Sequence, residues 1–394
     1  MSSGELDWDV VITDASNRLG YSILRSLAHD GLKVGIGVDS NSGMAVYSRY
    51  SAGSFRHPSH VCDPLGFMAA LNHTLRVHRP AVYMPADEDA FVVAKHANLL
   101  KEEVRTVLAP FDVLRQLDDK YQSFELAERI GIPTPATSCP KVFGEIEAFS
   151  RAHPGPLVLK ISRSSGGRGV FLLQPESLGE GVQQAIAHSG RGYGDFIVQE
   201  FVQAPGYAVS MLFDHGVPKA SFTHRRLREL SPRGGPSTLR QSTRLPVIEA
   251  YAERLLREVG YHGVAMVEFK HDEATGKTWF LEVNPRWWGS LALATQAGVD
   301  FPLLFYKLAL GENLPPPPTY RTGVTVRWLL GDLLAFKNQL IVTKRLPRIQ
   351  DFYPKVDGYD DAVAADPLPL VAELGLHLRK VLRAKWRGSP NFPR

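Results

Sequence analysis

Three oxygen-bearing side chains, Glu268, Glu282 and Asn284, lie in two apolar segments that are typical of β-strands. The segments are GVAMVEFK (263–270) and FLEVN (280–284), and the polar stretch HDEATGK between them predicts a hairpin loop. If the loop is centred near Thr275, Glu268 lies opposite Glu282, and strand alternation places Asn284 on the same face. Two buried carboxylates that face each other repel unless a cation compensates them. An all-oxygen set of this kind suits Mg²⁺, with Mn²⁺ as an alternative.

These acids have a second interpretation. Both could lie on a solvated sheet face without any ligand, and a single β-bulge would move one of them to the opposite face. The spacing of the residues alone leaves both interpretations open.

A glycine-rich loop follows the predicted strand PLVLK (156–160). In this loop, SRSSGGRGV (162–170), glycines allow close approach of a ligand, and successive backbone N–H groups can bind phosphate oxygens. Lys160 would add a positive charge at the same phosphates. The loop is not a Walker A motif, because no Lys-Ser or Lys-Thr follows the glycines. Lys120 is a second lysine, at a helix start, and VQEFV (198–202) offers an extended segment for an adenine edge.

Composition indicates a globular chain of several domains. The chain has 394 residues, 44% hydrophobic and 22% charged, which is too long for one ordinary core. It has no apolar run long enough for a transmembrane helix and no secretory signal at its start. The two cysteines predict a reducing, cytoplasmic location, and the net charge of +4 does not indicate nucleic acid binding.

The first part of the chain predicts a Rossmann-like unit. WDVVITDASNRLGYSILRSLAHDGLKVGIGVDS (8–40) has the pattern strand, turn, amphipathic helix, strand. Its turn lacks the G-x-G-x-x-G fingerprint, which favours a scaffold domain over a dinucleotide site and disfavours a dehydrogenase. A further strand and helix follow, and Asp112 begins a new helix.

Two later segments have open interpretations. HRRLRELSPRGGPSTLRQSTR (224–244) shows no regular periodicity and predicts a long loop, whose arginines either clamp an anionic substrate or are solvated. The basic C-terminal stretch LVAELGLHLRKVLRAKWRG (370–388) predicts an amphipathic helix. Such a helix could lie on an anionic membrane surface, but more often its apolar face docks on its own protein.

The order of these motifs resembles the ATP-grasp superfamily. The matching residues are Lys120, Lys160 with its glycine loop, Gln199 to Val202, Glu268 and the stretch FLEVNPR. The resemblance covers roughly residues 112–311 and is strongest to the carboxylate–amine ligase branch, with similarity also to the ATP-grasp domains of carbamoyl-phosphate synthetase large chain and biotin carboxylase. It implies an α/β fold with an N-terminal Rossmann-like pre-ATP-grasp domain, a two-subdomain ATP-grasp fold and a helical C-terminal extension.

The resemblance also implies roles for individual residues. The nucleotide phosphates would be bound by Lys120, Lys160, Ser165, Gly166, Gly167 and Gly169, adenine by Glu200, Phe201 and Val202, and magnesium by Glu268, Glu282 and Asn284. The acceptor carboxylate or its acyl phosphate would be held by Arg286, whose planar fork allows two parallel contacts. Arg226 and Arg228 are further candidates for catalytic arginines, and packing of Arg286 on Trp287 or Trp288 is the alternative for that side chain.

The implied reaction is an ADP-forming ligation. ATP, a carboxylate and an amine would give an amide through an acyl phosphate, with release of ADP and phosphate. The substrates would be small and amino-acid-like, and a homodimer is one assembly that the sequence leaves open. The alternative is a nucleotide-binding regulatory protein that keeps the fold without turnover.

Two positions depart from the family pattern. Pro205 stands about where family members carry an acid that grips the ribose, so the resemblance assigns no residue of this sequence to the ribose. Trp287 and Trp288 follow the Glu-x-Asn-Pro-Arg stretch where biotin carboxylase continues toward a catalytic glutamate, which argues against bicarbonate chemistry. The expected domain limits are 1–111, 112–190, 191–318 and 319–394.

Overall fold

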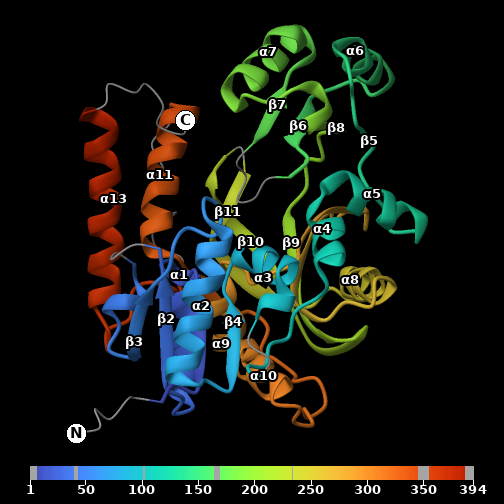
Figure 1. Ribbon diagram of the computed structural model, residues 1–394. Helices are drawn as coiled ribbons and strands as arrows, with labels where there is room; N and C mark the ends of the chain where they lie inside the picture. The colour runs from blue at the N-terminus through green and yellow to red at the C-terminus, as the bar shows by residue number, and fades with distance from the viewer. Residues whose placement is uncertain are drawn as a thin grey trace, which may run out of the picture.

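A computed structural model describes residues 7–39, 43–100, 103–163, 169–232, 234–344 and 355–386. Three sheets organise the chain: one of four strands in the order β3-β2-β1-β4, one of four in the order β5-β8-β6-β7, and one of seven in the order β13-β12-β9-β10-β11-β14-β15. In Figure 1 the second sheet and its helices form a lobe at the top, above the large sheet.

The N-terminal sheet is wholly parallel, as a Rossmann-like unit requires. Its strands are β1 (Val10–Thr13), β2 (Val34–Val38), β3 (Ser51–Arg56) and β4 (Val82–Pro85), and its helices are α1 (Arg18–His29), α2 (Pro64–His78) and α3 (Asp89–Lys95). β1, β2 and β4 are buried along their whole length, because helices cover a parallel sheet on both faces. Their carboxyl ends bring Asp14 and Asp87 to one edge of the sheet.

The lobe at the top of Figure 1 is a small antiparallel sheet covered by helices. It comprises β5 (Thr137–Ser138), β6 (Leu157–Ile161), β7 (Val170–Leu173) and β8 (Phe196–Glu200), with α6 (Phe143–Ala152) and α7 (Leu178–Ser189). α4 (Phe111–Asp118) and α5 (Lys120–Arg129) lead into it. Since β8 pairs with β5 and β6, this sheet continues past residue 190, the expected limit of the subdomain.

The large sheet provides the floor of the candidate site. Its central strands are β9 (Gly206–Asp214), β10 (Val217–Ser231), β11 (Gly234–Thr243), β12 (Gly263–His271) and β13 (Thr278–Asn284). The helices α8 (Pro246–Glu258), α9 (Leu291–Ala297) and α10 (Phe301–Ala309) pack against it. Trp287 and Trp288, which follow β13, are almost fully buried in the core shared with the N-terminal domain.

The expectation of a long loop at residues 224–244 is wrong. This segment forms most of β10 and all of β11, which pair as an antiparallel hairpin. The usual alternation of apolar and polar residues is missing because several buried positions in β11 are polar, among them Thr238, Arg240 and Ser242. Buried ion pairs and hydrogen bonds compensate these groups, so the strands form without a hydrophobic pattern.

The C-terminal extension contains strands as well as helices. β14 (Thr325–Arg327) and β15 (Gly358–Tyr359) extend the large sheet, while α11 (Leu329–Thr343) and α13 (Leu368–Trp386) form the left edge of the molecule in Figure 1. Leu374 and Leu378 of α13 are 39% and 60% exposed, whereas Leu376 of the same helix lines a cavity together with residues of α11. Within the described residues, no helix is both long enough and apolar enough to span a membrane.

Candidate active site

A cavity of about 420 Å³ lies between the small antiparallel sheet and the large sheet. β6, β7 and the end of β8 line one wall, and β10, β12 and β13 line the other. Most of the residues singled out in the sequence meet here: Lys120, Lys160, Glu200, Phe201, Val202, Arg226, Glu268, Glu282, Asn284 and Arg286. The cavity therefore brings together motifs that are spread over more than 160 residues of the chain.

The two carboxylates face each other as the hairpin predicts. Glu268 is the register partner of Glu282, and the Asn284 amide donates a hydrogen bond of 3.2 Å to Glu268 Oε1. A β-bulge produces this register, since Phe269 pairs with Phe280 and Leu281 is the extra residue. Without the bulge, Glu268 would lie opposite Leu281, and the two acids would be on different faces of the sheet.

Cations from two other elements compensate the acids. Arg226 of β10 forms an ion pair with Glu268, and Lys120 Nζ, at the start of α5, lies 3.5 Å from Glu282 Oε2. Burial raises the pKa of Glu268 to about 7, an effect that Arg226 opposes and Glu282 reinforces. Burial would raise the pKa of Glu282, but Lys120, Lys160 and Arg226 together lower it below its usual value. The two acids therefore differ in their pKa values although they lie opposite each other.

Lys160 extends from β6 over the same acids. Its Nζ donates a hydrogen bond of 2.7 Å to Gln199 Oε1, and burial lowers its pKa to about 8 while Glu282 opposes the shift. Gly169 closes the loop after β6 at φ +81°, and a side chain there would meet Ile161 Cδ1 at 2.5 Å, so only glycine fits. Ser165, Gly166 and Gly167 of the expected phosphate loop lie outside the described residues, as does Arg233.

The segment after β8 also lines the cavity. Glu200 Oε1 accepts a hydrogen bond of 3.2 Å from the Ala136 amide, while Phe201 is 44% exposed and lines the cavity with Val202. Gly206, one residue after Pro205, also lines it and has no side chain. The Glu229 carboxylate of β10 occupies the adjacent space, 3.5 Å from where a Gly206 Cβ would lie.

The three candidate arginines separate in the structure. Arg286 lies two residues after β13, where its Nη2 is 3.4 Å from Asn284 Oδ1 and its Nη1 is 3.3 Å from Asp87 Oδ1. Arg226 points into the cavity. Arg228 does not: its Nη1 is 2.6 Å from Asp332 Oδ2 of α11, and it lies over Phe336.

A bulge again explains the difference between the two neighbouring arginines. Arg226 pairs with Arg240 and Arg228 pairs with Leu239, so Leu227 is an extra residue. Residues two apart on a regular strand share a face, but this extra residue sends Arg228 to the opposite one. Arg228 is therefore a contact between β10 and α11, and its expected catalytic role is not supported by its position.

Three cavity residues were missed as site residues in the sequence. Gln199 lies in the segment expected to bind adenine, but its side chain accepts a hydrogen bond from Lys160. Glu229 and Arg18 gave no signal, because a lone acid in an aperiodic segment and a lone arginine at a helix start are ordinary surface features. Arg18 reaches the cavity from the N-terminal domain, and its Nη1 lies 2.7 Å from Asp360 Oδ2.

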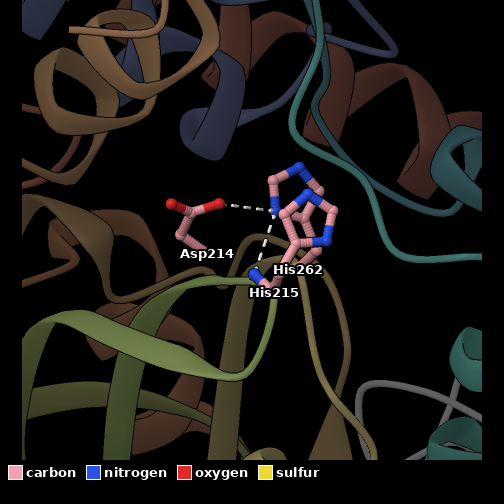
Figure 2. Close-up of side chains that lie close together, drawn as sticks. All are labelled: Asp214, His215 and His262. Atoms are coloured by element: carbon pink, nitrogen blue, oxygen red, sulfur yellow. Dashed lines mark hydrogen bonds and ion pairs between the residues drawn. The ribbon is translucent and has the colours of Figure 1, made fainter.

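A separate group of polar side chains lies at the other end of β9. Figure 2 shows Asp214, His215 and His262, whose side-chain ligand atoms lie within 4.8 Å of one another. The two imidazole rings are stacked at 4.0 Å, and the His215 backbone amide and Asp214 Oδ1 both lie near His262 Nδ1, at 3.4 and 3.5 Å. Lys219 also lies 3.5 Å from Asp214, so this group is already compensated internally and is distinct from the cavity.

Comparison with known proteins supports the resemblance to the ATP-grasp superfamily that the motifs indicate. Residues 193–331 match the family model described as "ATP-grasp in the biosynthetic pathway with Ter operon". Pyruvate carboxylase 1 of Caenorhabditis elegans is 27% identical over 220 residues, covering 52% of this chain and 18% of that protein. The biotin-dependent acyl-coenzyme A carboxylase alpha3 subunit of Mycobacterium leprae is 27% identical over 214 residues, covering 51% of this chain and 36% of that subunit. The chain thus spans well under half the length of these relatives.

Solved structures share the fold over most of the chain. The biotin carboxylase–β,γ-ATP complex of Campylobacter jejuni superposes with a TM-score of 0.64 at 16% identity, covering 81% of this chain and 74% of that one. N5-carboxyaminoimidazole synthetase of Staphylococcus aureus, complexed with ADP, gives a TM-score of 0.65 at 14% identity, covering 87% and 88%. L-amino acid ligase of Bacillus licheniformis gives 0.59 at 17% identity, covering 77% and 74%. The expected fold class is confirmed.

Proposed function

We propose, from the ATP-grasp fold of this chain, that it is an ATP-dependent carboxylate–amine ligase that releases ADP and phosphate. One observation carries the proposal: the paired acids Glu268 and Glu282 face Lys120 and Lys160 across one cavity, and Arg286 stands at its inner end. Acids that would hold a metal, lysines that would hold phosphates and an arginine that would hold a carboxylate are the groups that phosphoryl transfer to a carboxylate needs.

Mg²⁺ fits the donor set in this cavity. Two facing carboxylates and an amide are oxygen ligands of the kind it prefers, and burial raises the pKa of Glu268, so a bound dication would stabilise its ionised form. Glu268, Glu282 and Asn284 would hold the ion, with Mn²⁺ as a substitute. When bound, it would supply charge compensation for the phosphate oxygens.

The protein residues would divide the remaining work. Lys120 and Lys160 would hold the nucleotide phosphates, and Arg286 would hold the acceptor carboxylate in line with the γ-phosphorus. A carboxylate oxygen would bond to that phosphorus as its bond to the β,γ-bridging oxygen breaks, and ADP would leave. The amine nitrogen would then bond to the acyl carbon, with loss of phosphate from that carbon and of a proton from the nitrogen.

The test is ADP release by the full chain with Mg-ATP and a panel of carboxylates and amines. We expect release to depend on both substrates, and Glu282→Gln to lower it by about 10²-fold or more, because a carboxylate at the phosphate site is lost. Glu258→Gln, at an exposed ion pair on α8, is the matched control and should keep full activity.

The competing candidate is a regulatory protein that binds ATP without turnover. Saturable Mg-ATP binding with no ADP release for any pair in the panel would support it. Full activity in a folded Glu282→Gln variant would instead remove the proposed metal site.

A further inference from the structure

A second cavity, of about 460 Å³, lies directly beside the nucleotide cavity. The two share Arg18, Arg286 and Gly289 in their linings. Its other walls come from the turn before α1, the segment after β4, and the facing sides of α11 and α13. A molecule in this cavity could therefore reach Arg286 without entering the nucleotide cavity.

One wall of this second cavity carries a close pair of opposite charges. Arg286 Nη1 lies 3.3 Å from Asp87 Oδ1, and their side chains are 13% and 26% exposed, so both are partly accessible. Asn17 Nδ2 also donates to Asp87 Oδ2, at 3.4 Å. Burial raises the pKa of Asp87, and Arg286 opposes this shift, so a further cation at Asp87 would stabilise its ionised form.

Arg18 and Glu373 also line this cavity, and Glu373 Oε2 is buried without a hydrogen-bond partner among the described residues. Arg18 lies 2.7 Å from Asp360 and stacks over the Trp328 ring at 4.1 Å, and Glu373 Oε1 accepts a hydrogen bond of 3.1 Å from Trp328 Nε1. These contacts hold the corner where α1, α11 and α13 meet. Asp87 and Arg286 form an ion pair in the lining of the second cavity, and Arg286 also lines the nucleotide cavity.

The wall opposite this pair is apolar. Leu19 and Met44 line it from the N-terminal domain, Leu330 and Leu334 from α11, and Leu376 from α13. A ligand bound at the charged pair would thus place its other end among aliphatic side chains, where burial of apolar surface favours binding.

We propose that this second cavity binds an α-amino acid with an apolar side chain, its carboxylate on Arg286 and its ammonium on Asp87. The carboxylate carbon and the ammonium nitrogen of an α-amino acid are only two bonds apart. The carboxylate can contact Arg286 while the ammonium contacts Asp87, so one ligand satisfies both groups. This assignment rests on the proposed function, since the carboxylate on Arg286 would be the one phosphorylated. It makes α11 and α13 the elements that select the side chain.

The test measures binding by calorimetry, with the full chain and Mg-ADP present, and so does not require turnover. L-leucine should bind, whereas 4-methylpentanoate, which lacks the ammonium, and L-glutamate should each bind about 10-fold more weakly or worse. Asp87→Asn should weaken L-leucine by about 10-fold or more and leave 4-methylpentanoate unchanged. Asp112→Asn, at an exposed position in the first turn of α4, is the charge-matched control and should change neither ligand.

A second variant tests the apolar wall independently of Asp87. Leu334→Trp should fill the cavity, abolish L-leucine binding and keep L-alanine binding. Equal affinity for L-leucine and 4-methylpentanoate, or L-leucine binding unchanged by both variants, would overturn the assignment. ADP release that depends on other carboxylates while L-leucine fails to bind would also overturn it, yet would leave the ligase proposal standing.

Discussion

At the scale of single residues, the cavity depends on side chains whose charges are tuned by their neighbours. Glu268 and Glu282 are chemically identical, lie opposite each other and are both buried, but at Glu282 the combined effect of Lys120, Lys160 and Arg226 exceeds the effect of burial. The pKa values of the pair are therefore pushed in opposite directions. Such separation is common at functional sites, because it keeps one group ionised while the other responds to a ligand.

We predict that Glu229 binds the ribose in place of the acid that is missing near Pro205. Its carboxylate fills the space beside Gly206, so it can accept hydrogen bonds from the ribose hydroxyls. Glu229→Gln should lower the preference for ATP over 2′-deoxy-ATP by about 10-fold, the scale of one charge-assisted hydrogen bond. Competition binding of the two nucleotides measures this ratio, and a parent protein that does not discriminate between them would contradict the assignment.

Our second prediction is that Lys160 makes the affinity for nucleotide depend on pH. Its pKa of about 8 means that the free protein loses this positive charge above pH 8, whereas bound phosphates favour the protonated form. The Kd for Mg-ADP should therefore rise about eightfold from pH 7.5 to 9, as expected for one group of that pKa. The acid Glu268, with a pKa of about 7, is already about three-quarters ionised at pH 7.5 and changes much less than Lys160 over this range. Lys160→Gln should bind more weakly and show no such rise.

At the scale of elements, buried ion pairs join segments that are distant in the chain. Asp360, next to β15, is fully buried between Arg240 of β11 and Arg18 of α1. On the other side of the sheet, Asp332 of α11 is paired with Arg228 of β10 and Arg327 of β14. These pairs hold the C-terminal extension against the large sheet and so form the second cavity.

Asp360→Asn should strongly destabilise the protein. The change leaves two arginine charges without their shared counter-ion in a buried position, which costs about 3–5 kcal/mol when one partner of a buried pair is removed. Urea unfolding followed by tryptophan fluorescence measures the loss. Glu253→Gln removes an exposed acid paired with Arg257 and should change the free energy of unfolding by no more than about 0.5 kcal/mol. Similar losses in the two variants would contradict the role given to Asp360.

At the scale of the whole molecule, the site lies where three parts of the chain meet. The small antiparallel sheet provides Lys160, the large sheet provides the acids, and the N-terminal domain provides Asp87 and Arg18. Arg286 touches two of these parts at once, through Asn284 and Asp87. In the proposed reaction, its fork would set the position of the acceptor carboxylate relative to both β13 and the N-terminal domain.

Arg286→Lys tests this placement. Lysine keeps the charge but cannot contact both partners with a planar fork, so the variant should bind Mg-ATP about as well as the parent and lose roughly 10²-fold in kcat. Nucleotide titration and ADP release at saturating ATP measure the two quantities separately. Lost nucleotide affinity with normal kcat would place Arg286 in the nucleotide site instead.

Local patterns in the sequence determined the acid pair, the lysines, the Rossmann-like unit and the order of the motifs. These features depend on residues that are close in the chain, such as Glu268 and Glu282 across one hairpin, where alternation restricts which side chains can meet. Even there, the bulge at Leu281 was decided by pairing in the folded sheet. The sequence offered both outcomes, because a shift of one residue conserves composition and reverses the face.

Only the tertiary structure determined the formation and contacts of β10 and β11 and the contacts of the C-terminal helices. Their buried polar residues remove the hydrophobic pattern from which a strand is predicted, and the compensating charges lie far away, as Arg240 and Asp360 do. Arg226, Arg228 and Glu229 stand side by side in the sequence, yet a bulge sends Arg228 to α11 while Arg226 and Glu229 line the cavity. Contacts between distant segments depend on packing of the whole chain, which local spacing does not encode.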